Sequence, residues 1–371
     1  MFKKLMINGF FPFWYKVCCH RRIKNIALFI ETKEKKISTN FTGIIAYIKR
    51  NGIKHNDNVK TDAHFLGLGK CSTLSYLKNC LCLMPKLASA KYVFINDSTS
   101  VIAALKLRKG TRVIQTWHGC GALKKFGYSS DDKEKNYGNE DIVTVSSERV
   151  VDYYSKSMGI STEKIYPIGV PRSDVYFQDT YKEKCANLRE EILKGRNKKI
   201  VLYAPTFRGN DTKAIYSQGL NLDLMYKHLG QEYIIISKFH NTLKPETRQY
   251  RHRDFYYDVT DMWTIEEAMG VCDVLITDYS CLIFEYSLLG KPVIFYAYDL
   301  NEYSNERGFF IDYKSEMPGV ICESTLDIIK VIKNGCFDVG RMNEFKNKYM
   351  EKCDGHSTKR LIELIAGEHY V

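Results

Sequence analysis

The sequence predicts an α/β protein of two doubly wound domains that face each other across a cleft. Its 371 residues are many for a single hydrophobic core and suit two domains of common size. Short apolar runs alternate with amphipathic stretches, which is typical of β-α-β units in a parallel sheet. Hydrophobic residues form 44% of the chain, enough for substantial cores and too many for a disordered protein.

The expected strands fall into two series, joined by a polar helix and turn at residues 181–199. Helices are expected between the strands, for example at residues 100–107 and 148–158, and at the end of the chain at 342–349 and 358–365. The last helices could couple the domains by crossing back to the first. The predicted strands are 26–30, 92–95, 113–117, 142–145 and 165–168 in the first series, and 200–204, 234–237, 255–259, 274–277 and 293–297 in the second.

The segment from residue 274 to 299 has the pattern of a strand, a polar turn, a helix and a second strand. The helix of such a unit begins at the carboxyl edge of the sheet, where its free N–H groups favour an anion. Thr277, Asp278 and Ser280 lie at this point. Their side chains could hold a phosphate or simply cap the helix, and both interpretations stay open.

A second polar motif follows the strand that ends at residue 117. It contains His118, then Gly119 and Gly121, then two lysines. Histidine is a natural general base near neutral pH, and glycine lets a ligand approach the backbone closely. A single histidine at a strand end is often structural, so this motif alone does not establish a site.

Basic and hydroxyl residues also follow other strands, at 171–174, 205–208 and 238–240. Each set could be an ordinary solvated loop. Their repetition at the same edge of successive strands favours a ligand site, because open α/β sheets bind ligands there.

The net charge of +12 is concentrated near the N-terminus, where residues 1–60 hold 13 Lys or Arg and 3 Asp or Glu. Residues 1–16 mix lysines with Phe, Trp and Tyr, a pattern typical of a segment lying on an anionic membrane. The alternative is a segment packed on the protein with its lysines in solvent. Such a basic patch would bind nucleic acid in vitro whatever the function, so binding of this kind would not identify a partner. We expect no nucleic-acid partner.

Neither a signal peptide nor a membrane span is expected, since Asn8, Pro12 and Lys16 interrupt the first apolar run and no later run reaches the ~18 residues needed. The 12 cysteines form no CxxC pair and fit reduced thiols, and we expect no metal site made by Cys or His. These features predict a peripheral protein on the cytoplasmic face of the cell membrane.

Taken together, six motifs resemble the CDP-glycerol glycerophosphotransferase family, which comprises teichoic acid primases and polymerases and related capsule enzymes. They occur in the family's order over about residues 90–315. The motifs are QTWHG at 115–119, LKKFG at 123–127, APTFR at 204–208, KFH at 238–240, ITDYS at 276–280, and FYAYDL through RGF at 295–309.

The resemblance implies a GT-B-like fold, with a membrane-surface segment at 1–24, an acceptor domain at 25–190, a CDP-donor domain at 196–340 and C-terminal helices at 341–371. It also implies transfer of glycerol phosphate from CDP-glycerol to a lipid-linked saccharide, such as an undecaprenyl diphosphate derivative, or to a growing polymer, with release of CMP. His118 would take the acceptor proton, and His240 is the second catalytic candidate.

The remaining site residues are also assigned by matching motifs. No cofactor is required, although the carboxylates leave a Mg²⁺ ion open. The residues implied for CDP-glycerol are Gly119, Cys120, Gly121, Arg172, Pro205, Thr206, Arg208, Lys238, Phe239, Thr277, Asp278, Ser280, Cys281, Glu285 and Asp299, and those implied for the acceptor or a phosphate are Lys124, Lys125 and Arg307.

Several positions depart from the family pattern, including Cys120, Asn241 and Cys281. They leave CDP-ribitol open as the donor. The alternatives are a GT-B glycosyltransferase that uses a nucleotide sugar and a non-catalytic protein whose basic N-terminus binds nucleic acid or anionic lipid. The length of the chain favours a primase or capsule-type transferase over a long polymerase.

Overall fold

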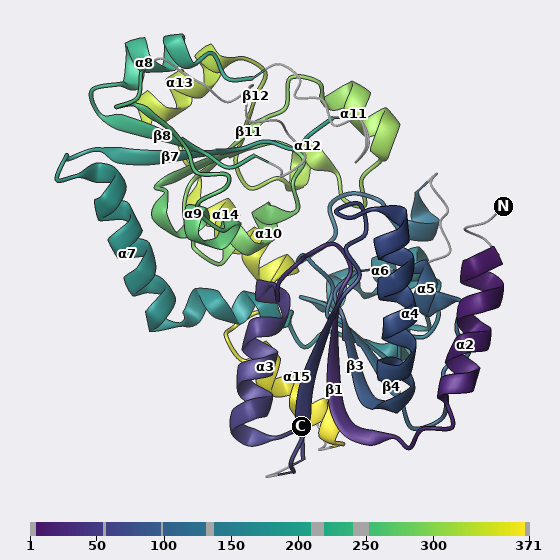
Figure 1. Ribbon diagram of the computed structural model, residues 1–371. Helices are drawn as coiled ribbons and strands as arrows, with labels where there is room; N and C mark the ends of the chain where they lie inside the picture. The colour runs from purple at the N-terminus through teal and green to yellow at the C-terminus, as the bar shows by residue number, and fades with distance from the viewer. Residues whose placement is uncertain are drawn as a thin grey trace. The chain divides into compact units, whose positions relative to one another are not determined.

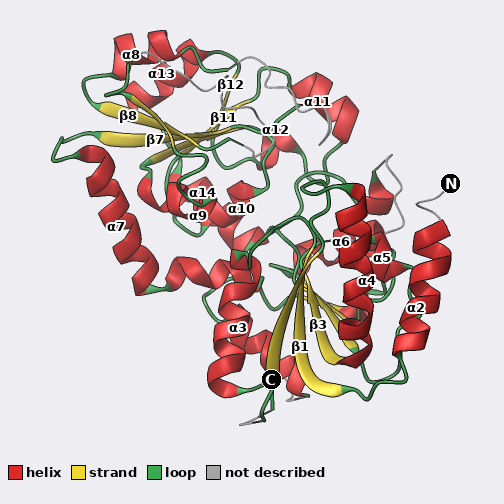
Figure 2. Cartoon of the chain, in the orientation of Figure 1, coloured by secondary structure: helices red, strands yellow, loops and turns green. Residues whose placement is uncertain are grey.

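The computed structural model describes residues 5–54, 57–97, 99–130, 137–208, 219–239 and 252–367. The chain divides into two compact units (Figures 1 and 2). One comprises Met1–Val175 together with Tyr349–Val371, and the other comprises Tyr176–Lys348. Each unit contains a six-stranded parallel sheet, which confirms the expected pair of doubly wound α/β domains.

The first sheet has the strand order β2-β1-β3-β4-β5-β6. Its central strand, β1, is apolar on both faces because helices cover both sides of the sheet. Ala27 and Phe29 lie in the core on one face, and Leu28 and Ile30 lie in the core on the other. The strands are β1 (Lys24–Glu31), β2 (Lys60–Phe65), β3 (Ala90–Ile95), β4 (Arg112–Gln115), β5 (Ile142–Thr144) and β6 (Ile165–Tyr166).

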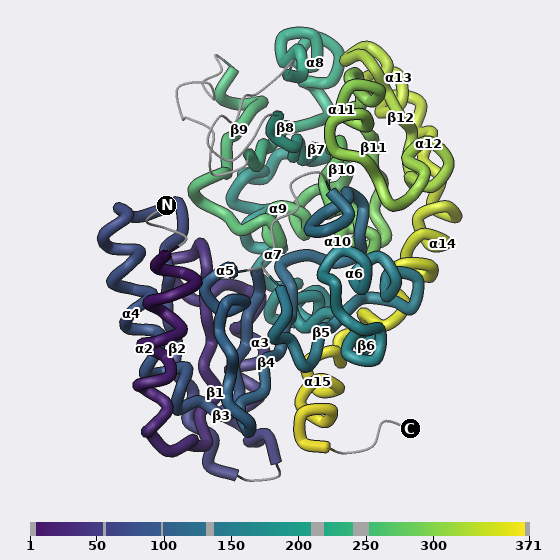
Figure 3. Tube along the Cα trace, turned by 90° about the vertical axis from the view of Figure 1, so that its right-hand side faces the viewer, coloured from purple at the N-terminus to yellow at the C-terminus, as the bar shows by residue number. Residues whose placement is uncertain are grey.

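Two helices on each face complete these cores (Figures 1 and 3). On one face α2 (Phe11–Cys18) packs along α4 (Thr73–Ser89), and on the other α15 (Ser357–Ala366) packs against α3 (Thr39–Asn51). The C-terminal helix is therefore part of the first unit. This unit also contains α5 (Ser100–Ala103), α6 (Val151–Met158), the π-helix η1 (Met6–Phe10) and the 3₁₀ helices η2 (Gly127–Ser129), η3 (Glu148–Val150) and η4 (Thr162–Lys164). The 3₁₀ helix η5 (Pro171–Phe177) begins in this unit and ends two residues beyond its boundary.

The second sheet has the order β12-β11-β10-β7-β8-β9. The strands are β7 (Lys199–Ala204), β8 (Tyr233–Ser237), β9 (Tyr256–Asp258), β10 (Val274–Thr277), β11 (Val293–Tyr296) and β12 (Val320–Cys322). The helices are α7 (Asp179–Leu193), α8 (Leu222–Leu229), α9 (Ile265–Val271), α10 (Leu282–Ser287), α11 (Leu300–Arg307), α12 (Tyr313–Glu316), α13 (Thr325–Asn334) and α14 (Val339–Tyr349).

Helix α7 belongs to the second unit because it is tied to α9 and to the residue before β10. The Tyr181 hydroxyl donates to Glu266 O at 2.8 Å, and the Arg189 guanidinium donates to the Asp273 carboxylate at 2.9 Å. The boundary between the units therefore lies at residue 175 in the structure and at residue 190 in the division made from the sequence.

The N-terminal helix α2 has one packed face and one exposed apolar face. Phe11, Tyr15 and Cys18 are buried in the core that α2 shares with α4. In the same helix Phe13 is 62% exposed and Trp14 is 37% exposed. The segment is thus packed on the protein and still presents aromatic side chains to solvent. Within the described residues, no helix is long and apolar enough to cross a bilayer.

Candidate active site

The polar residues predicted from the sequence follow the carboxyl ends of strands in both sheets. In the first unit His118 follows β4 and Arg172 follows β6. In the second unit Arg208, Asp278 and Asp299 follow β7, β10 and β11. Because all strands in each sheet are parallel, these residues share one edge of their sheet.

The His118 ring is oriented through its Nδ1 atom. This atom lies 3.2 Å from Asn96 O and 3.7 Å from a carboxylate oxygen of Asp97. A carbonyl oxygen can only accept, so the hydrogen bond to Asn96 places the proton on Nδ1 and leaves the lone pair on Nε2. The other Asp97 oxygen lies 3.6 Å from the Lys33 ammonium group. The arrangement prepares Nε2 to accept a proton.

The protonation state of His118 also fits a base. Its side chain is 54% exposed, yet the protein around the ring is dense enough to disfavour the charged form. This desolvation lowers the pKa of His118 below its ordinary 6.5, the Asp97 carboxylate acts in the opposite direction, and the charges of Lys33 and Arg172 lower the pKa further. The imidazole is therefore mainly neutral at pH 7.

Trp117, which the sequence did not single out, shapes the approach to His118. Its φ angle is 58°, a left-handed value that is unfavourable for a bulky side chain. Such strain costs on the order of 1–3 kcal/mol and persists where the surroundings enforce it. Here the Gln115 side chain accepts a bond from Trp117 N at 3.0 Å, and the indole packs against the rings of Phe126 and Tyr154.

The loop after His118 contains two glycines with different surroundings. Gly119 has free space beside it, and Gly121 is fixed by hydrogen bonds. No atom lies within 4 Å of the position that a Cβ would take at Gly119. Gly121, in contrast, has a φ of 63°, donates to Ser146 Oγ at 3.2 Å and accepts from the Tyr154 hydroxyl at 2.9 Å. Cys120 between them is buried, whereas Lys125 further along is exposed. Of these residues, Gly119 is the one that leaves space for a ligand.

Arg172 lies beside this loop in the first unit. Its Nη1 donates to His118 O and, at 3.1 Å, to the Asn40 side chain. The structure thus brings together two residues that are separated by more than fifty positions in the sequence. The family resemblance placed Arg172 on the pyrophosphate, and its position next to His118 puts its positive charge near the candidate base.

In the second unit Arg208 is the centre of a buried ionic network. Its Nε and Nη2 lie 2.7 and 2.9 Å from the two Asp299 oxygens, and its Nη1 lies 2.9 Å from Asp278. Nη1 also donates to Thr206 O at 2.7 Å. The side chain is only 13% exposed. These bonds tie together the loops that follow β7, β10 and β11.

Aromatic rings enclose the same guanidinium group. Its carbon lies 4.9 Å from the ring centre of Tyr279 and 5.0 Å from that of Tyr303, at cation–π distance. Burial disfavours the charge of Arg208, but its bonds to Asp299 and Asp278 outweigh this and raise its pKa. Burial also disfavours the charged form of Asp299, which raises its pKa. The hydrogen bonds from Arg208 and Tyr279 outweigh this effect and bring the pKa below its ordinary value. Arg208 and Asp299 therefore stay ionised.

This network bears on the Mg²⁺ ion that the sequence left open. Asp278 and Asp299 are already paired with Arg208, and Glu285 accepts a bond from the Tyr176 hydroxyl at 2.9 Å. Within the described ranges, no group of three or more His, Cys, Asp or Glu side chains could hold a metal. These three carboxylates do not fit a resident Mg²⁺ site.

The hydroxyl groups near Asp278 differ in what they can still bind. The Thr277 hydroxyl donates to Ala204 O at 2.7 Å, and Ser280 Oγ accepts from Leu282 N at 3.3 Å, as a helix cap would. Cys281 precedes the six-residue helix α10 and makes no side-chain cap bond. The Thr206 hydroxyl is buried and has no hydrogen-bond partner among the described residues. Of these hydroxyl groups, the Thr206 hydroxyl is the one whose hydrogen-bonding capacity is unused within the described residues.

The motif after β8 is described only in part. The Lys238 ammonium donates to Thr260 O at 2.5 Å, and burial lowers its pKa although nearby acidic residues such as Asp261 raise it. Phe239 is buried and its amide donates to Thr260 Oγ1 at 3.0 Å. His240, the second catalytic candidate, lies outside the described residues.

The other predicted contacts lie around these groups. Pro205 is half-buried directly after β7, and Lys124 is half-buried in the loop after His118. Arg307 ends α11, with its Nε 3.7 Å from the Glu306 carboxylate.

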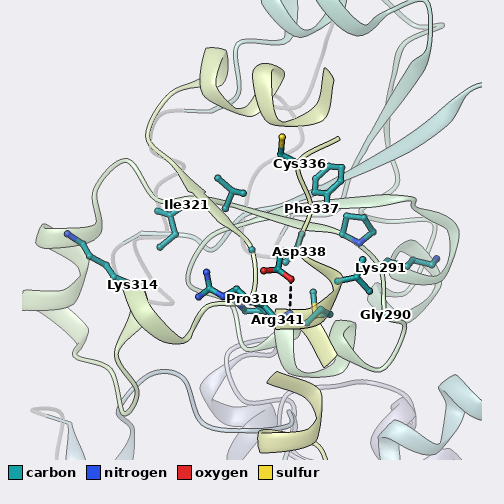
Figure 4. Close-up of a pocket in the computed structure, with 15 residues that line it drawn as sticks. Gly290, Lys291, Lys314, Pro318, Ile321, Cys336, Phe337, Asp338 and Arg341 are labelled. Carbon is teal, nitrogen blue, oxygen red and sulfur yellow. Dashed lines mark hydrogen bonds between the residues drawn. The ribbon is translucent and has the colours of Figure 1, made fainter. Parts of the chain in front are cut away.

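A pocket of about 320 Å³ opens at the other edge of the second sheet, where β11 and β12 begin (Figure 4). Two of its three cations are already bound to backbone carbonyl groups. Lys291 donates to three of them, including Gly270 O at 2.6 Å, and Arg341 donates to Ser315 O and Met317 O at 2.9 Å. The pocket contains none of the predicted site residues, so we assign it no role in the reaction.

Two parallel sheets with polar residues at their carboxyl edges define a two-domain α/β protein of the GT-B-like class. A structure of the wall teichoic acid polymerase TagF, from a variant soaked with CDPG, has this fold. It aligns with a TM-score of 0.76 and 21% identity over 99% of this chain and 95% of that chain. The expected GT-B-like fold is confirmed.

The sequence family can be stated as well. The family described as CDP-Glycerol:Poly(glycerophosphate) glycerophosphotransferase matches residues 14–367, and the chain belongs to it. This confirms the resemblance found in the motifs.

Three relatives show the range of the family. A teichoic acid poly(ribitol-phosphate) polymerase of Bacillus spizizenii is 32% identical over 87% of this chain and 54% of its own length. A ribitol-phosphate primase of the same species is 30% identical over 90% of this chain and 89% of its own length. A glycerol-phosphate primase of Bacillus subtilis is 32% identical over 75% and 74%. The chain spans between 54% and 63% of the length of several ribitol-phosphate polymerases that it matches.

Proposed function

We propose that this protein transfers glycerol phosphate from CDP-glycerol to a hydroxyl group of a lipid-linked saccharide or growing polymer, as a step in teichoic acid or capsule-type polymer synthesis. The observation that carries the proposal is the state of His118. In a chain of this family, the ring is oriented through Nδ1, mainly neutral at pH 7 and half exposed to solvent.

In the proposed reaction His118 Nε2 takes the proton of the acceptor hydroxyl. The acceptor oxygen then forms a bond to the phosphorus that carries glycerol. The bond between this phosphorus and the bridging oxygen breaks, and CMP leaves with the electron pair. Transfer of this kind depends on positioning and charge neutralisation more than on covalent chemistry by the protein.

The protein groups that would neutralise the donor phosphates are basic and hydroxyl side chains. We assign this role to Lys238 and His240, and to the Thr206 hydroxyl, which lacks a partner among the described residues. Arg172 would add positive charge near His118. Arg208 would act differently, by holding Asp278 and the loops around the donor in place.

CDP-ribitol is the second candidate donor. The relatives include ribitol-phosphate and glycerol-phosphate primases at similar identity, 30% and 32%. The match over 89% of the length of a primase supports addition of a first unit. The acceptor that we propose is an undecaprenyl-diphosphate-linked saccharide. A nucleotide-sugar transferase of the same fold is the alternative reaction.

We also propose that the protein binds the cytoplasmic face of the membrane through α2. Phe13 and Trp14 of this helix are exposed although Phe11, Tyr15 and Cys18 are buried, and the segment up to residue 24 is rich in Lys and Arg. Aromatic side chains at the lipid interface and cations on phosphate headgroups are the usual elements of such binding.

The test is release of CMP from CDP-glycerol and from CDP-ribitol, with and without a lipid-linked disaccharide acceptor. We expect acceptor-dependent release from one donor, which would identify both the reaction and the donor. Absence of CMP from a folded protein with either donor and several acceptors would contradict the proposal. A screen of nucleotide sugars would then test the alternative.

A further inference from the structure

The C-terminal helix α15 depends on a residue that lies nearly two hundred positions earlier. Its N-cap position is His356, whose side chain makes no cap bond. The Asp174 carboxylate takes that place, accepting from Ser357 N at 3.0 Å and from Thr358 N at 2.7 Å. Asp174 is buried, so these two amide bonds have little competition from water.

The same short segment reaches the candidate base. Asp174 and Arg172 both lie in η5, and Arg172 donates to His118 O. One side of this turn thus binds the start of α15 and the other side binds the backbone of His118. A shift of η5 would therefore change the contacts at the start of α15 and those at the His118 backbone.

A second set of contacts supports the loop after His118 from another direction. Ser146 Oγ accepts from Gly121 N, and Ser146 O accepts from Lys352 N, both at 3.2 Å. The Cys353 thiol also lies near the side chain of Cys120. Residues 352 and 353, just before α15, therefore contact the loop directly and through Ser146.

The backbone at Gly169 packs tightly against the C-terminal segment at Lys352 and Ser357. A Cβ added at Gly169 would lie 2.3 Å from Lys352 O and 2.2 Å from Ser357 Oγ, far inside contact distance. Gly169 also has a φ of 89°, which favours glycine. The turn that carries Arg172 and Asp174 is pressed directly against the C-terminal segment.

From these contacts we infer that the C-terminal segment 352–358 positions the His118 loop, and that Asp174 is the positioning residue that links the two. Asp174 touches neither the candidate base nor a predicted donor contact. Its effect on turnover rests on the proposed function, but its effect on the loop does not.

The experiment uses Asp174→Ala and Asp174→Asn in the full chain. Hydrogen exchange of peptides covering residues 113–124 reports on the loop whether or not the protein is active. We expect faster exchange after residue 117 in Asp174→Ala, with the β4 strand still protected. With the proposed donor we expect kcat to fall roughly 10- to 100-fold with little change in the donor KM, since a misplacement of about 1 Å can have this effect.

Asp174→Asn keeps one acceptor oxygen and should retain more of the wild-type kcat and loop protection than Asp174→Ala. It also serves if the alanine variant fails to fold. The control is Ser324→Ala, which removes the cap of α13, another ten-residue helix, in the second unit. We expect normal kcat and normal exchange at residues 118–124 in this variant.

The outcomes separate the two claims. If the wild-type protein releases no CMP but Asp174→Ala still loosens the loop, the proposed function fails and the inference stands. If either Asp174 variant folds, frees the amides of Ser357 and Thr358, and leaves exchange at residues 118–124 unchanged, the inference is overturned.

Discussion

His118 in the first unit and Arg208 in the second are both polar residues at the carboxyl edge of a parallel sheet, yet their surroundings are opposite. The His118 side chain is half exposed and, within the part of the chain that the structure describes, is oriented through Nδ1. The Arg208 side chain is buried, and three of its nitrogens bind two carboxylates and a carbonyl group.

This difference indicates that His118 is arranged to react with a substrate, whereas Arg208 is arranged to fix the loops around it. A nitrogen lone pair directed at solvent can accept a proton from a substrate, whereas a guanidinium group with its donors occupied can only fix its neighbours. The same motif pattern at strand ends therefore contains both kinds of residue. Substitutions should affect activity at one and stability at the other.

The largest expected effect is on catalysis by His118→Ala. Removal of a general base typically lowers turnover by ~10²–10⁴-fold. Because the side chain contributes little packing, we expect the melting temperature to stay within about 2 °C of wild type. CMP release and thermal unfolding measure the two quantities. Activity within a factor of two of wild type would remove His118 from the mechanism.

Arg208→Met should instead destabilise the second unit. It leaves the carboxylates of Asp278 and Asp299 buried without a cation, and breaking a buried pair in this way costs about 3–5 kcal/mol. Urea unfolding at pH 7 gives the loss. The control is Lys330→Met, which breaks an exposed pair with Asp327 and should cost less than ~1 kcal/mol. Equal losses in the two variants would contradict the distinction between the sites.

The exposed side chains of α2 are a third case in this comparison. Like His118, and unlike Arg208, they would contact a partner outside the protein, which in the proposed function is the membrane. Replacing Phe13 and Trp14 with Ser should weaken sedimentation with anionic vesicles by roughly tenfold or more, since each buried aromatic group contributes a few kcal/mol. Leu326→Ser, at a leucine that is 49% exposed on α13, is the control. If both variants bind vesicles like wild type, α2 is not the membrane contact.

The smallest expected effect is a shift of the pH profile. Protonation of Nε2 removes the base, so kcat/KM should fall as the pH drops through the pKa of His118, below 6.5. Asp97 raises this pKa, so Asp97→Asn should move the acidic limb to lower pH. Lys33 lowers it, so Lys33→Met should move the limb upward. An acidic limb that stays in place in both variants would mean that another group titrates.

The parts of the fold that the sequence predicted are those with a strong local pattern. Interior strands such as β1 and β7 are continuous apolar runs and were found. The edge strands β2 and β12 were missed. Strand β2 is mostly polar and half exposed, and of the three residues of β12 only Cys322 is buried. The helix expected at residues 100–107 ends at Ala103, since the Asn139 side chain binds the carbonyl groups of Ile102 and Leu105.

For the candidate site, the sequence located the strand-end motifs but not the residues that orient them. Asn96 and Asp97 follow the neighbouring strand β3, and only the order of strands in the sheet places them beside His118. The left-handed backbone conformation of Trp117 could not be predicted, because bulky residues rarely adopt it. The pairing of Arg208 with two carboxylates depends on distances between loops that are separated by seventy to ninety positions.

The first unit is assembled from two stretches of chain, with the whole second unit between them. During synthesis the second unit can fold as soon as it leaves the ribosome, while the first waits for its last helix. Until then the apolar face of the first sheet formed by Phe29 and Ile114 lacks Leu361, Ile362 and Ile365, and the Asp174 carboxylate lacks the two amides that it binds. The first unit, including the support of the His118 loop, can therefore be completed only after the whole second unit has been synthesised.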